Sequence, residues 1–591
     1  MPRAMLLSTS SFPMFFRVTA CLVFALIAGG LPSLSLAQSQ PAPAYKNVTS
    51  ERLTNPEPRN WLMYRGTYDS MGYSALDQIN TGNVSGLVPA WTFSTGMREG
   101  HQAPPIVNEG VMFVSAPHNR VLALDARTGD LLWRYDRDLP EDQFQMHPTN
   151  RGVALYADRV YLATADCYLV ALDARTGEVV WESEVGDYTA GYYMTLAPLI
   201  AEGKVMVGVS GGEFGIRGFI TAFDAMTGEE AWKTYTIPAP GEPGSETWEG
   251  ESWKTGGVSI WVTGSYDPQL GLTYWGTGNG APWMGDARPG DNLYATSVIA
   301  LDVKTGAIRA HHQYHWNDSW DWDEVSAPLL LDFKREGRTI SGLVHPGRNG
   351  YLWFLERGRD RIDFVDALPF VRQNVFTSLD PKTGRPSYDL ARKPGIGKRA
   401  EFCPSHWGGK DWPPAAYSPK TGYLYIPANE NLCGSMEGKE IEYRPGRTFM
   451  GGVGEIVPHE EAKDHIGELQ AWDLDGPKKV WTKTFASHNW GPVLATAGDV
   501  IFMGGTNDRY FRAFDARTGD ELWKQRTNSG ITAVPSTYEV DGVQYVAVLS
   551  GWGVDSARMQ TRLNKQLKTK TYVPQGGVLW VFALPQPTPA P

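Results

Sequence analysis

Short alternations of apolar and polar residues recur along the chain, and several of them end in the same turn phrase. The clearest form, Ala-Leu-Asp-Ala-Arg-Thr-Gly, occupies residues 123–129 and 171–177, and a tryptophan follows eight residues after each Asp. Alternation predicts a half-buried strand, and Asp with Gly predicts a tight turn, because the carboxylate accepts backbone N–H groups and glycine tolerates a positive φ. Each copy therefore predicts a strand, a turn and a second strand. Related copies lie at 222–228, 300–306, 471–473 and 513–519, with a degenerate copy at 354–358.

The spacing of these copies predicts the architecture. Their Asp positions follow one another after 48, 51, 78, 171 and 42 residues, which fits a unit of about 45 residues with insertions. A unit of this length is typical of a four-stranded propeller blade, with the recurring Trp docked between neighbouring sheets. We therefore predict an all-β fold, an eight-bladed β-propeller with Trp-docking blade repeats and with inserted capping loops at 236–258 and 376–470. The run at 576–584 is predicted to be the strand that closes the ring onto the N-terminal region.

The composition supports this fold class and narrows the choice of partners. Of 591 residues, 64 are Gly and 41 are Pro, which would interrupt the helices of a bundle. Aromatic residues make up 12% of the chain, including 22 Trp, and so much apolar surface excludes a disordered chain. The net charge of −11, with no basic run beyond the N-terminus, makes nucleic acid a poor candidate partner. A neutral or basic substrate, or a basic protein partner, stays open.

The first 37 residues have the pattern of a secretory signal peptide. Arg3 and Arg17 precede an apolar run at 18–31, and the small-x-small sequence Ser-Leu-Ala follows at 35–37. A membrane anchor is the alternative, but the run is short and ends in Gly and Pro residues. We therefore predict export to the periplasm, a single propeller domain at 38–591, and no membrane span in the mature chain.

Three cysteines remain after the predicted signal peptide. Cys403 and Cys433 are 30 residues apart, and a disulfide between them is plausible in an oxidising compartment. Cys167 lies in a strand-like apolar run and is predicted to be a buried free thiol. None of the three begins a Cys-x-x-Cys-His sequence, so covalently bound c-type haem is not expected.

Four further motifs are specific. They are Gly-Gly-Glu-Phe-Gly-Ile-Arg-Gly at 211–218, Gly-Thr-Gly-Asn at 276–279, Trp-Asp-Trp-Asp at 320–323 and His-Pro-Gly-Arg-Asn-Gly at 345–350. With these motifs and the Trp-bearing repeats, the chain resembles the exported alcohol dehydrogenases that depend on pyrroloquinoline quinone (PQQ), a family that includes the methanol dehydrogenase large subunit. The resemblance implies PQQ- and metal-dependent oxidation of a primary or secondary alcohol to an aldehyde or ketone.

The resemblance also implies which residues form the site. Such chemistry needs a Lewis acid on the quinone carbonyl and a base for the hydroxyl proton, and hard cations prefer oxygen ligands. Asp321 is implied as the base, and Arg348 as the catalytic donor to the quinone oxygens. Trp261 is implied to stack under the cofactor and Trp490 to cover it, although a purely structural role for Trp490 is equally open. The implied metal ligands are Glu213, Asn279, Asp321 and Asp323, and the implied contacts to the cofactor's carboxylates and ring edge are Arg151, Thr195, Ser210, Gly211, Gly212 and Ser259.

Asp323 bears on the identity of the metal. In calcium-dependent relatives a small residue usually stands two positions after the catalytic Asp, whereas lanthanide-dependent relatives carry a second Asp there. One more carboxylate raises the ligand charge and the coordination number, which suits a trivalent ion of calcium-like size. The resemblance therefore implies one lanthanide ion, with Ca²⁺ as the alternative. A loop Asp that caps a turn or faces water is the structural alternative.

Three places depart from the family pattern. Many relatives carry adjacent cysteines over the quinone, whereas Gln145 and Met146 stand at the corresponding place. Gln102 occupies a position where Glu is expected, and Asp411 replaces the usual Asn near the quinone. An anion at 411 would lower the potential of the cofactor unless a neighbouring cation compensates. The missing cysteine ring and the long segment 376–470 favour a larger primary or secondary alcohol over methanol.

The chain contains no haem-binding motif, which bears on its electron acceptor. Because no haem motif is present, the resemblance implies a separate soluble cytochrome c, which the acidic surface would attract if it is basic. A homodimer stays open, as do two other functions: a non-catalytic exported propeller scaffold and a PQQ-dependent sugar dehydrogenase. His311, His312 and His315 invite comparison with a zinc site, but their spacing predicts a loop or strand surface.

Overall fold

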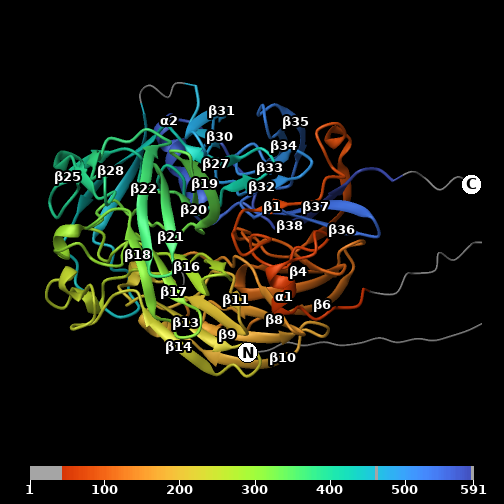
Figure 1. Ribbon diagram of the computed structural model, residues 1–591, viewed down its shortest axis with the longest axis horizontal. Coiled ribbons are helices and arrows are strands. Elements are labelled where there is room, and N and C mark those ends of the chain that lie inside the picture. The colour runs from red at the N-terminus through yellow and green to blue at the C-terminus, as the bar shows by residue number, and fades with distance from the viewer. Residues whose placement is uncertain (1–42, 145, 460–463, 587–591) are drawn as a thin grey trace, which may run out of the picture. The chain divides into compact units, whose positions relative to one another are not determined.

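The computed structural model describes residues 43–144, 146–459 and 464–586, which belong to one structural unit, Pro43–Pro591. The predicted signal peptide at 1–37 and Gln145 lie outside the described residues. The fold is all-β, as predicted, with many short strands and few helices (Figure 1). The α-helices are α1 (Ser50–Thr54) and α2 (Val554–Leu567).

Eight sheets of four or five strands contain most of the strands in the described residues. In the first five, four successive strands pair antiparallel with their chain neighbours, as the Asp-turn repeat predicts. These five sheets contain β3 (Ile106–Asn108), β4 (Val111–Ala116), β5 (Arg120–Asp125) and β6 (Leu131–Tyr135); β7 (Ala154–Tyr156), β8 (Arg159–Ala163), β9 (Tyr168–Asp173) and β10 (Val179–Glu184); β11 (Leu199–Ala201), β12 (Lys204–Gly208), β13 (Phe219–Asp224) and β14 (Glu230–Tyr235); β15 (Ser265–Asp267), β16 (Leu272–Gly276), β17 (Ser297–Asp302) and β18 (Ile308–Gln313); and β19 (Leu329–Arg335), β20 (Arg338–Pro346), β21 (Tyr351–Gly358) and β22 (Arg361–Pro369).

The other three large sheets combine strands that are further apart in the chain. The parallel pairing of β1 with β32 and the antiparallel pairing of β2 with β38 join the N-terminal strands to C-terminal sheets. These sheets contain β26 (Ala416–Ser418), β27 (Tyr423–Asn429), β30 (Gly467–Asp473) and β31 (Lys478–Phe485); β1 (Tyr73–Ser74), β32 (Val493–Thr496), β33 (Val500–Met503), β34 (Tyr510–Asp515) and β35 (Glu521–Arg526); and β36 (Ser536–Val540), β37 (Val543–Ser550), β38 (Val578–Ala583) and β2 (Val88–Ser94).

The pairing of β38 with β2 confirms that the last strand meets the N-terminal region. These two strands come from opposite ends of the chain and pair antiparallel. Strands such as β4 and β8 are almost wholly buried, whereas fourth strands such as β10 alternate between exposed and half-buried positions. Cys167, which follows β8, is buried and free, as predicted.

Repeated Asp turns and tryptophans connect several of the sheets to their neighbours. The Asp173 carboxylate accepts the backbone N–H of Thr176 at 3.0 Å. Trp133 donates its indole N–H to the Ala174 carbonyl of the following sheet at 3.0 Å. Gly177 has a φ of 76°, and a Cβ there would stand 2.5 Å from Trp133, so glycine is required. The predicted Trp docking is therefore confirmed. The same indole-to-carbonyl bond joins Trp232 to Val303, Trp481 to Ala516 and Trp523 to Leu87.

The segment 376–470 was expected to be a capping insertion, and this expectation is only partly correct. It supplies β26 and β27 to a large sheet, and the rest forms a hairpin and a three-stranded sheet. The Asp turn recurs here unrecognised: Asp380 accepts the Thr383 N–H at 2.8 Å, and a Cβ at Gly384 would stand 2.5 Å from Phe364. The repeat was missed because Phe364 replaces the usual Trp. The smaller sheets contain β23 (Phe376–Leu379) and β24 (Pro386–Tyr388), and β25 (Arg399–Phe402), β28 (Leu432–Gly438) and β29 (Gly452–Pro458).

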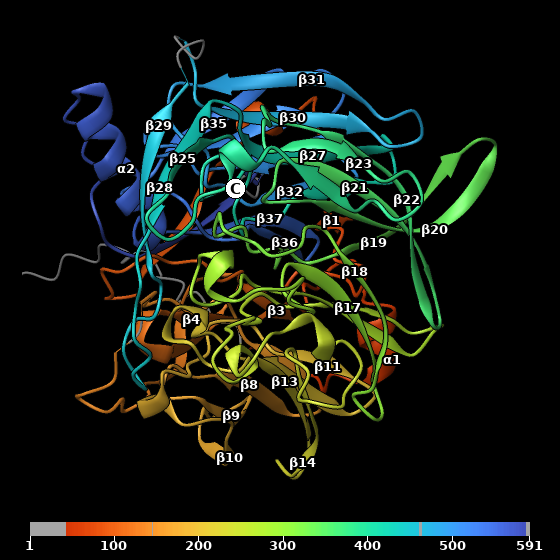
Figure 2. The same ribbon diagram turned by 90° about the vertical axis from the view of Figure 1, so that its left-hand side faces the viewer.

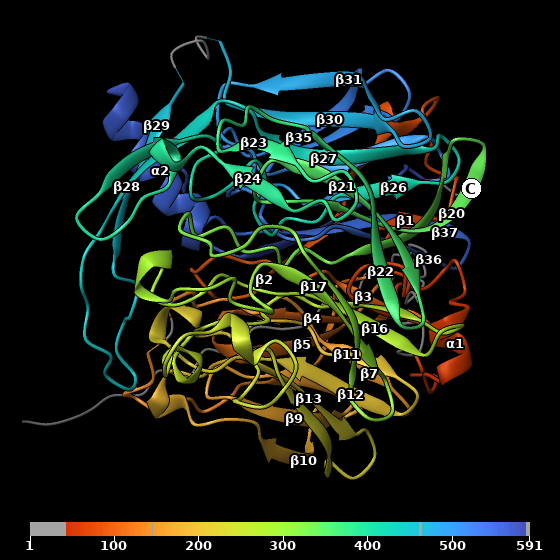
Figure 3. The same ribbon diagram turned by 60° about the vertical axis from the view of Figure 1, so that its left-hand side comes forward.

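The segment 236–258 carries only the short 3₁₀ helices η5 (Ser245–Thr247) and η6 (Ser252–Lys254), as expected of an insertion. Helix α2 was not predicted; it lies between β37 and β38 in the chain and packs beside β29. Figures 2 and 3 show this helix at one side of the molecule, next to β29. Its buried face carries Met559 and Leu563.

Candidate active site

One cavity of about 460 Å³ gathers most of the residues that the resemblance implied. Gly212 and Asn279 do not line the cavity but lie next to residues that do: a Cβ on Gly212 would stand 3.1 Å from the Ser259 Oγ, and the Asn279 backbone N–H donates to Asp323 at 2.6 Å. Trp490 does not line the cavity; its ring packs 5.9 Å from that of Trp407, which does. Eleven of the fourteen implied residues line the cavity: Arg151, Thr195, Ser210, Gly211, Glu213, Ser259, Trp261, Asp321, Asp323, Arg348 and Asp411.

The loop after β18 presents Asp321 to this cavity in an uncommon backbone conformation. Asp321 has a φ of 64°, which is rare for residues other than glycine and is often found at functional sites. The Asp318 carboxylate holds the loop by accepting the backbone N–H groups of Trp320 and Asp321 at 3.2 and 3.1 Å. His315 contacts the same carboxylate through Nε2 at 3.1 Å. Asp318 therefore shapes the loop that carries the implied base.

The expectation that the three histidines lie on a surface is wrong for two of them. Only His311 is exposed, whereas His312 and His315 are buried. The chain leaves β18 at Gln313 and turns inward, which carries His315 to Asp318. A strand pattern applied beyond the end of the strand therefore gave the wrong side.

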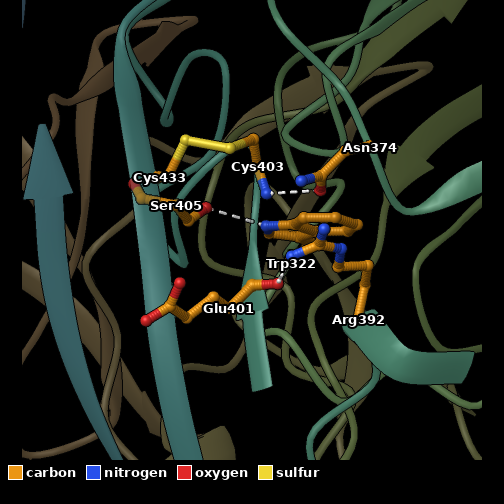
Figure 4. Close-up of a disulfide and its surroundings, with 7 residues drawn as sticks. All are labelled: Trp322, Asn374, Arg392, Glu401, Cys403, Ser405 and Cys433. Carbon is orange, nitrogen blue, oxygen red and sulfur yellow. Dashed lines mark hydrogen bonds between the residues drawn. A yellow bond between two sulfur atoms is a disulfide. The ribbon is translucent and has the colours of Figure 1, made fainter. Parts of the chain in front are cut away.

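The two tryptophans of the Trp-Asp-Trp-Asp motif anchor the loop. The rings of Trp320 and Trp322 stack 5.0 Å apart, and the Trp322 indole donates to the Ser405 carbonyl at 2.8 Å. Ser405 stands two residues after Cys403, which forms the predicted disulfide with Cys433. Figure 4 shows Trp322 beside this disulfide. The disulfide is thus confirmed, and it constrains the segment that positions Trp322.

Ion pairs run along one side of the cavity. Arg348 donates to the Asp323 Oδ2 at 2.8 Å and lies 2.9 Å from the Asp411 Oδ2, so Arg348 compensates the anion at 411. The other Asp323 oxygen accepts the Asn279 backbone N–H at 2.6 Å. Burial raises the pKa of Asp323 to about 7, against the influence of Arg348. Burial also raises the pKa of Asp321 well above its usual range, opposed by Arg348 and reinforced by Asp323. The site holds more buried carboxylate than its arginine neutralises.

Glu324 fixes the position of Arg348, and the sequence analysis missed it. Its buried carboxylate accepts the backbone N–H groups of Arg348 and Asn349 at 2.9 and 3.1 Å. It also contacts the His345 Nε2 at 2.7 Å. Glu324 directly follows the Trp-Asp-Trp-Asp motif, and this further acidic residue at the end of the motif was the signal in the sequence that could have identified it.

Another part of the lining suits a flat, acidic cofactor such as PQQ. Arg151 is buried and donates to the Thr195 Oγ1 at 2.5 Å, and this hydroxyl lies 3.1 Å from that of Ser210. Its guanidinium lies over the rings of Trp261 and Trp412, at 4.6 and 4.9 Å. Among the described residues no carboxylate pairs with Arg151, so its charge is available to a carboxylate of a ligand. The residues present therefore fit the cofactor.

Oxygen donors for a cation come from three separate segments. Glu213 lies in η4 (Gly212–Phe214), Asn279 follows β16, and Asp321 and Asp323 lie in the loop after β18. The Asn279 Oδ1 is buried without a hydrogen-bond partner, which is uncommon for a buried acceptor. In the part of the chain described, no three His, Cys, Asp or Glu side chains are close enough to hold an ion by themselves. Carboxylates repel one another without a cation, so this donor set fits a hard cation that draws it together.

Helix α2 adds three charged residues to the lining that the sequence analysis missed. Asp555, Arg558 and Arg562 stand three and four residues apart, which places them on one helical face. Arg558 pairs with Asp555 at 3.2 Å and donates to the Met146 carbonyl at 2.6 Å. Met146 also lines the cavity, whereas Gln102 is buried outside it.

Comparison with known proteins identifies the family. The profile described as "PQQ: Glucose/ethanol/alcohol dehydrogenase, beta-propeller domain" matches residues 61–360 and 461–546. Quinoprotein alcohol dehydrogenase PedH of Pseudomonas putida is 39% identical, with 87% of this chain and 89% of the relative covered. A lanthanide-dependent methanol dehydrogenase of Methylorubrum extorquens is 36% identical, with 93% and 98% covered. The solved structure of a europium-containing methanol dehydrogenase matches with a TM-score of 0.85 at 35% identity, covering 90% of this chain and 100% of that one. With this β-propeller match and the cavity above, the chain belongs to the PQQ-dependent quinoprotein alcohol dehydrogenases.

Proposed function

We propose that the chain oxidises a primary or secondary alcohol to an aldehyde or ketone, with PQQ and one metal ion in the cavity and Asp321 as the base. One observation carries this proposal: Glu213, Asp321, Asp323 and Arg348 line one cavity although they come from three separate segments of the chain. A scaffold propeller would have no need of such crowded, buried carboxylates, whose desolvation is costly.

The residues of this chain divide the work as follows. Asp321 takes the hydroxyl proton at its carboxylate, and Asp318 holds the loop so that this carboxylate faces the cavity. When bound, PQQ supplies the hydride acceptor and the metal ion supplies a Lewis acid. Arg348 provides N–H donors beside the carboxylates, and Glu324 holds its backbone. Because burial raises the pKa of Asp321, the base needs a cation beside it to be ionised at neutral pH.

For the metal we propose a lanthanide ion held by Glu213, Asn279, Asp321 and Asp323, with Ca²⁺ as the alternative. The support is that Asp323 lines the cavity, and that two similar proteins are described as lanthanide-dependent and europium-containing. The test is to reconstitute the metal-free chain with PQQ and either La³⁺ or Ca²⁺, and to follow dye reduction with a panel of alcohols. Activity with neither metal would overturn the proposed function.

The proposal extends to the surroundings of the enzyme. We propose export to the periplasm, from the pattern at 1–37, and electron transfer to a separate soluble cytochrome c, from the acidic charge and the missing haem motif. Within the described residues, no helix is both long and apolar enough to cross a membrane. Cell fractionation tests the location. Reoxidation by a basic cytochrome c that does not slow as salt rises would argue against the electrostatic encounter.

We also propose that the eight large sheets are the eight blades of the propeller. Eight sheets of four or five strands are present in the described residues, and the indole-to-carbonyl contacts join neighbours. A crystal structure with seven blades would contradict this count.

For the substrate we propose an alcohol larger than methanol, because Met146 rather than a cysteine ring borders the cavity.

A further inference from the structure

Arg562, an exposed arginine of α2, borders the cavity and forms no ion pair with a carboxylate of the described residues. Arg562 lines the cavity, lies 5.1 Å over the Trp407 ring and donates to the His406 Nε2 at 2.9 Å. Burial lowers the pKa of His406 to about 3, so this imidazole is neutral and accepts the bond. Arg558, one turn earlier, pairs with Asp555 at 3.2 Å, whereas Arg562 has no carboxylate partner among the described residues.

The surroundings of this arginine are apolar. Phe144, Trp283, Met450 and Val453 line the same cavity. Phe144 and Val453 are 63% and 59% exposed, so they border the cavity where it meets solvent. The cavity therefore joins an apolar part and an unpaired guanidinium to the carboxylate of Asp321.

This arrangement selects a class of substrate. A planar guanidinium binds a carboxylate through two parallel N–H bonds, and its stacking on Trp407 limits its motion. A neutral alcohol would leave the charge of Arg562 to water, whereas a carboxylate would pair with it. The apolar lining accommodates an aromatic or aliphatic body between the two polar ends of such a ligand.

We propose that Arg562 is a substrate-binding residue that favours alcohols carrying a carboxylate at the end remote from the hydroxyl, such as (hydroxymethyl)benzoates. This inference rests on the proposed function, because the hydroxyl end is oriented by Asp321. It goes beyond that function by naming the chemical class of the alcohol and the residue that selects it.

The test compares two alcohols of similar shape in the enzyme reconstituted with PQQ and La³⁺. The alcohols are 4-(hydroxymethyl)benzoate and 4-methylbenzyl alcohol, and the variants are Arg562→Gln and Arg562→Lys. We expect wild-type kcat/KM to favour the carboxylate by about tenfold, as a hydrogen bond to a charged group would give. Arg562→Gln should remove this preference, mainly through KM, and Arg562→Lys should keep part of it because the charge remains.

The control variant is Lys565→Gln, which removes the same charge from an exposed position of the same helix that, unlike the exposed Arg562, does not line the cavity. It should keep the wild-type preference; an equal loss in this control would show a general charge effect and overturn the assignment to Arg562. A wild-type enzyme without preference, or an Arg562→Gln variant that keeps it, would also overturn the proposal. Melting temperatures of all variants separate these outcomes from misfolding.

A binding measurement separates this inference from the proposed function. Calorimetric titration of the metal- and PQQ-free chain with 4-methylbenzoate, which has no hydroxyl to oxidise, should show binding that Arg562→Gln weakens about tenfold. If no alcohol is oxidised but benzoate binding depends on Arg562, the proposed function fails and the anion site stands. If alcohols are oxidised but benzoate binding is absent or unchanged by the variant, the inference fails alone.

Discussion

Asp224 and Asp321 show how the blades and the cavity use the same side chain differently. In its turn, Asp224 accepts the backbone N–H groups of Met226 and Thr227 at 2.8 and 2.9 Å, and these bonds lower its pKa. Asp321 is buried, and burial raises its pKa well above the usual range. Backbone N–H groups of the turn stabilise the Asp224 carboxylate, whereas the buried Asp321 carboxylate depends on a bound ligand for the same stabilisation. The difference between the two environments locates the function.

The largest expected effect comes from replacing aspartate with asparagine at position 321, compared with the same replacement at position 224. Asp321→Asn should lower kcat by about 10³-fold, since it removes a general base, while PQQ binding is retained. Asp224→Asn should leave kcat within about twofold and lower the free energy of unfolding by about 1 kcal/mol, because its turn bonds weaken. Steady-state dye reduction and urea unfolding measure the two effects. An Asp321→Asn enzyme with nearly wild-type kcat would contradict the assignment of the base.

Replacing Asp323 should affect the activity supported by La³⁺ more than the activity supported by Ca²⁺. Asp323→Ala should lower La³⁺-supported kcat/KM by about 100-fold and Ca²⁺-supported kcat/KM by less than about tenfold, because a trivalent ion loses more from a missing carboxylate. Asp411→Asn removes the other carboxylate partner of Arg348 and should keep the preference between the metals. Equal losses with both metals in Asp323→Ala would refute the lanthanide assignment.

Much of the architecture was predictable because its cause is local. The Asp and Gly of each turn, and the Trp that covers it, stand at fixed spacing, so a linear pattern finds them. The turn at 380–384 escaped because Phe364 does the packing there. The segment 376–470 was only partly an insertion, because β26 and β27 within it belong to a large sheet.

The candidate site was predictable only as far as its motifs reach. The family resemblance named most of the residues in the cavity, including Asp321 and Asp323. It missed Asp318 and Glu324, because their role depends on which backbone N–H groups the fold brings to them. Helix α2 was missed because its charged face meets the cavity only through tertiary packing.

A smaller effect compares two turn glycines with the same φ of 76°, Gly519 and Gly542. A Cβ at Gly519 would stand 2.6 Å from Trp481, whereas nothing lies within 4 Å of a Cβ at Gly542. Gly519→Ala should lower the free energy of unfolding by about 3 kcal/mol, from strain and overpacking together. Gly542→Ala should cost about 1 kcal/mol, from strain alone. Equal losses in urea unfolding would show that the Trp contact does not add to the requirement for glycine.

The last prediction concerns the pH dependence of stability in the metal-free chain. The pKa of Asp323 is raised from its unfolded value to about 7, so the folded state holds this proton more tightly. Its stabilising contribution is present below about pH 4 and is lost as the pH rises through about 7. Asp323→Asn should flatten this part of the profile in urea unfolding, and bound La³⁺ should do the same. A wild-type profile that rises between pH 4 and 7 and is unchanged by Asp323→Asn would contradict the raised pKa.

The most direct test of the central claim is a titration of the metal-free chain with PQQ, followed by absorbance, with and without La³⁺. We expect one PQQ and one La³⁺ to bind per chain, with PQQ binding tightened by the ion, and we expect this coupling to be lost in an Asp321→Ala, Asp323→Ala double variant. PQQ binding that does not respond to the ion, or coupling that survives in the double variant, would contradict the central claim.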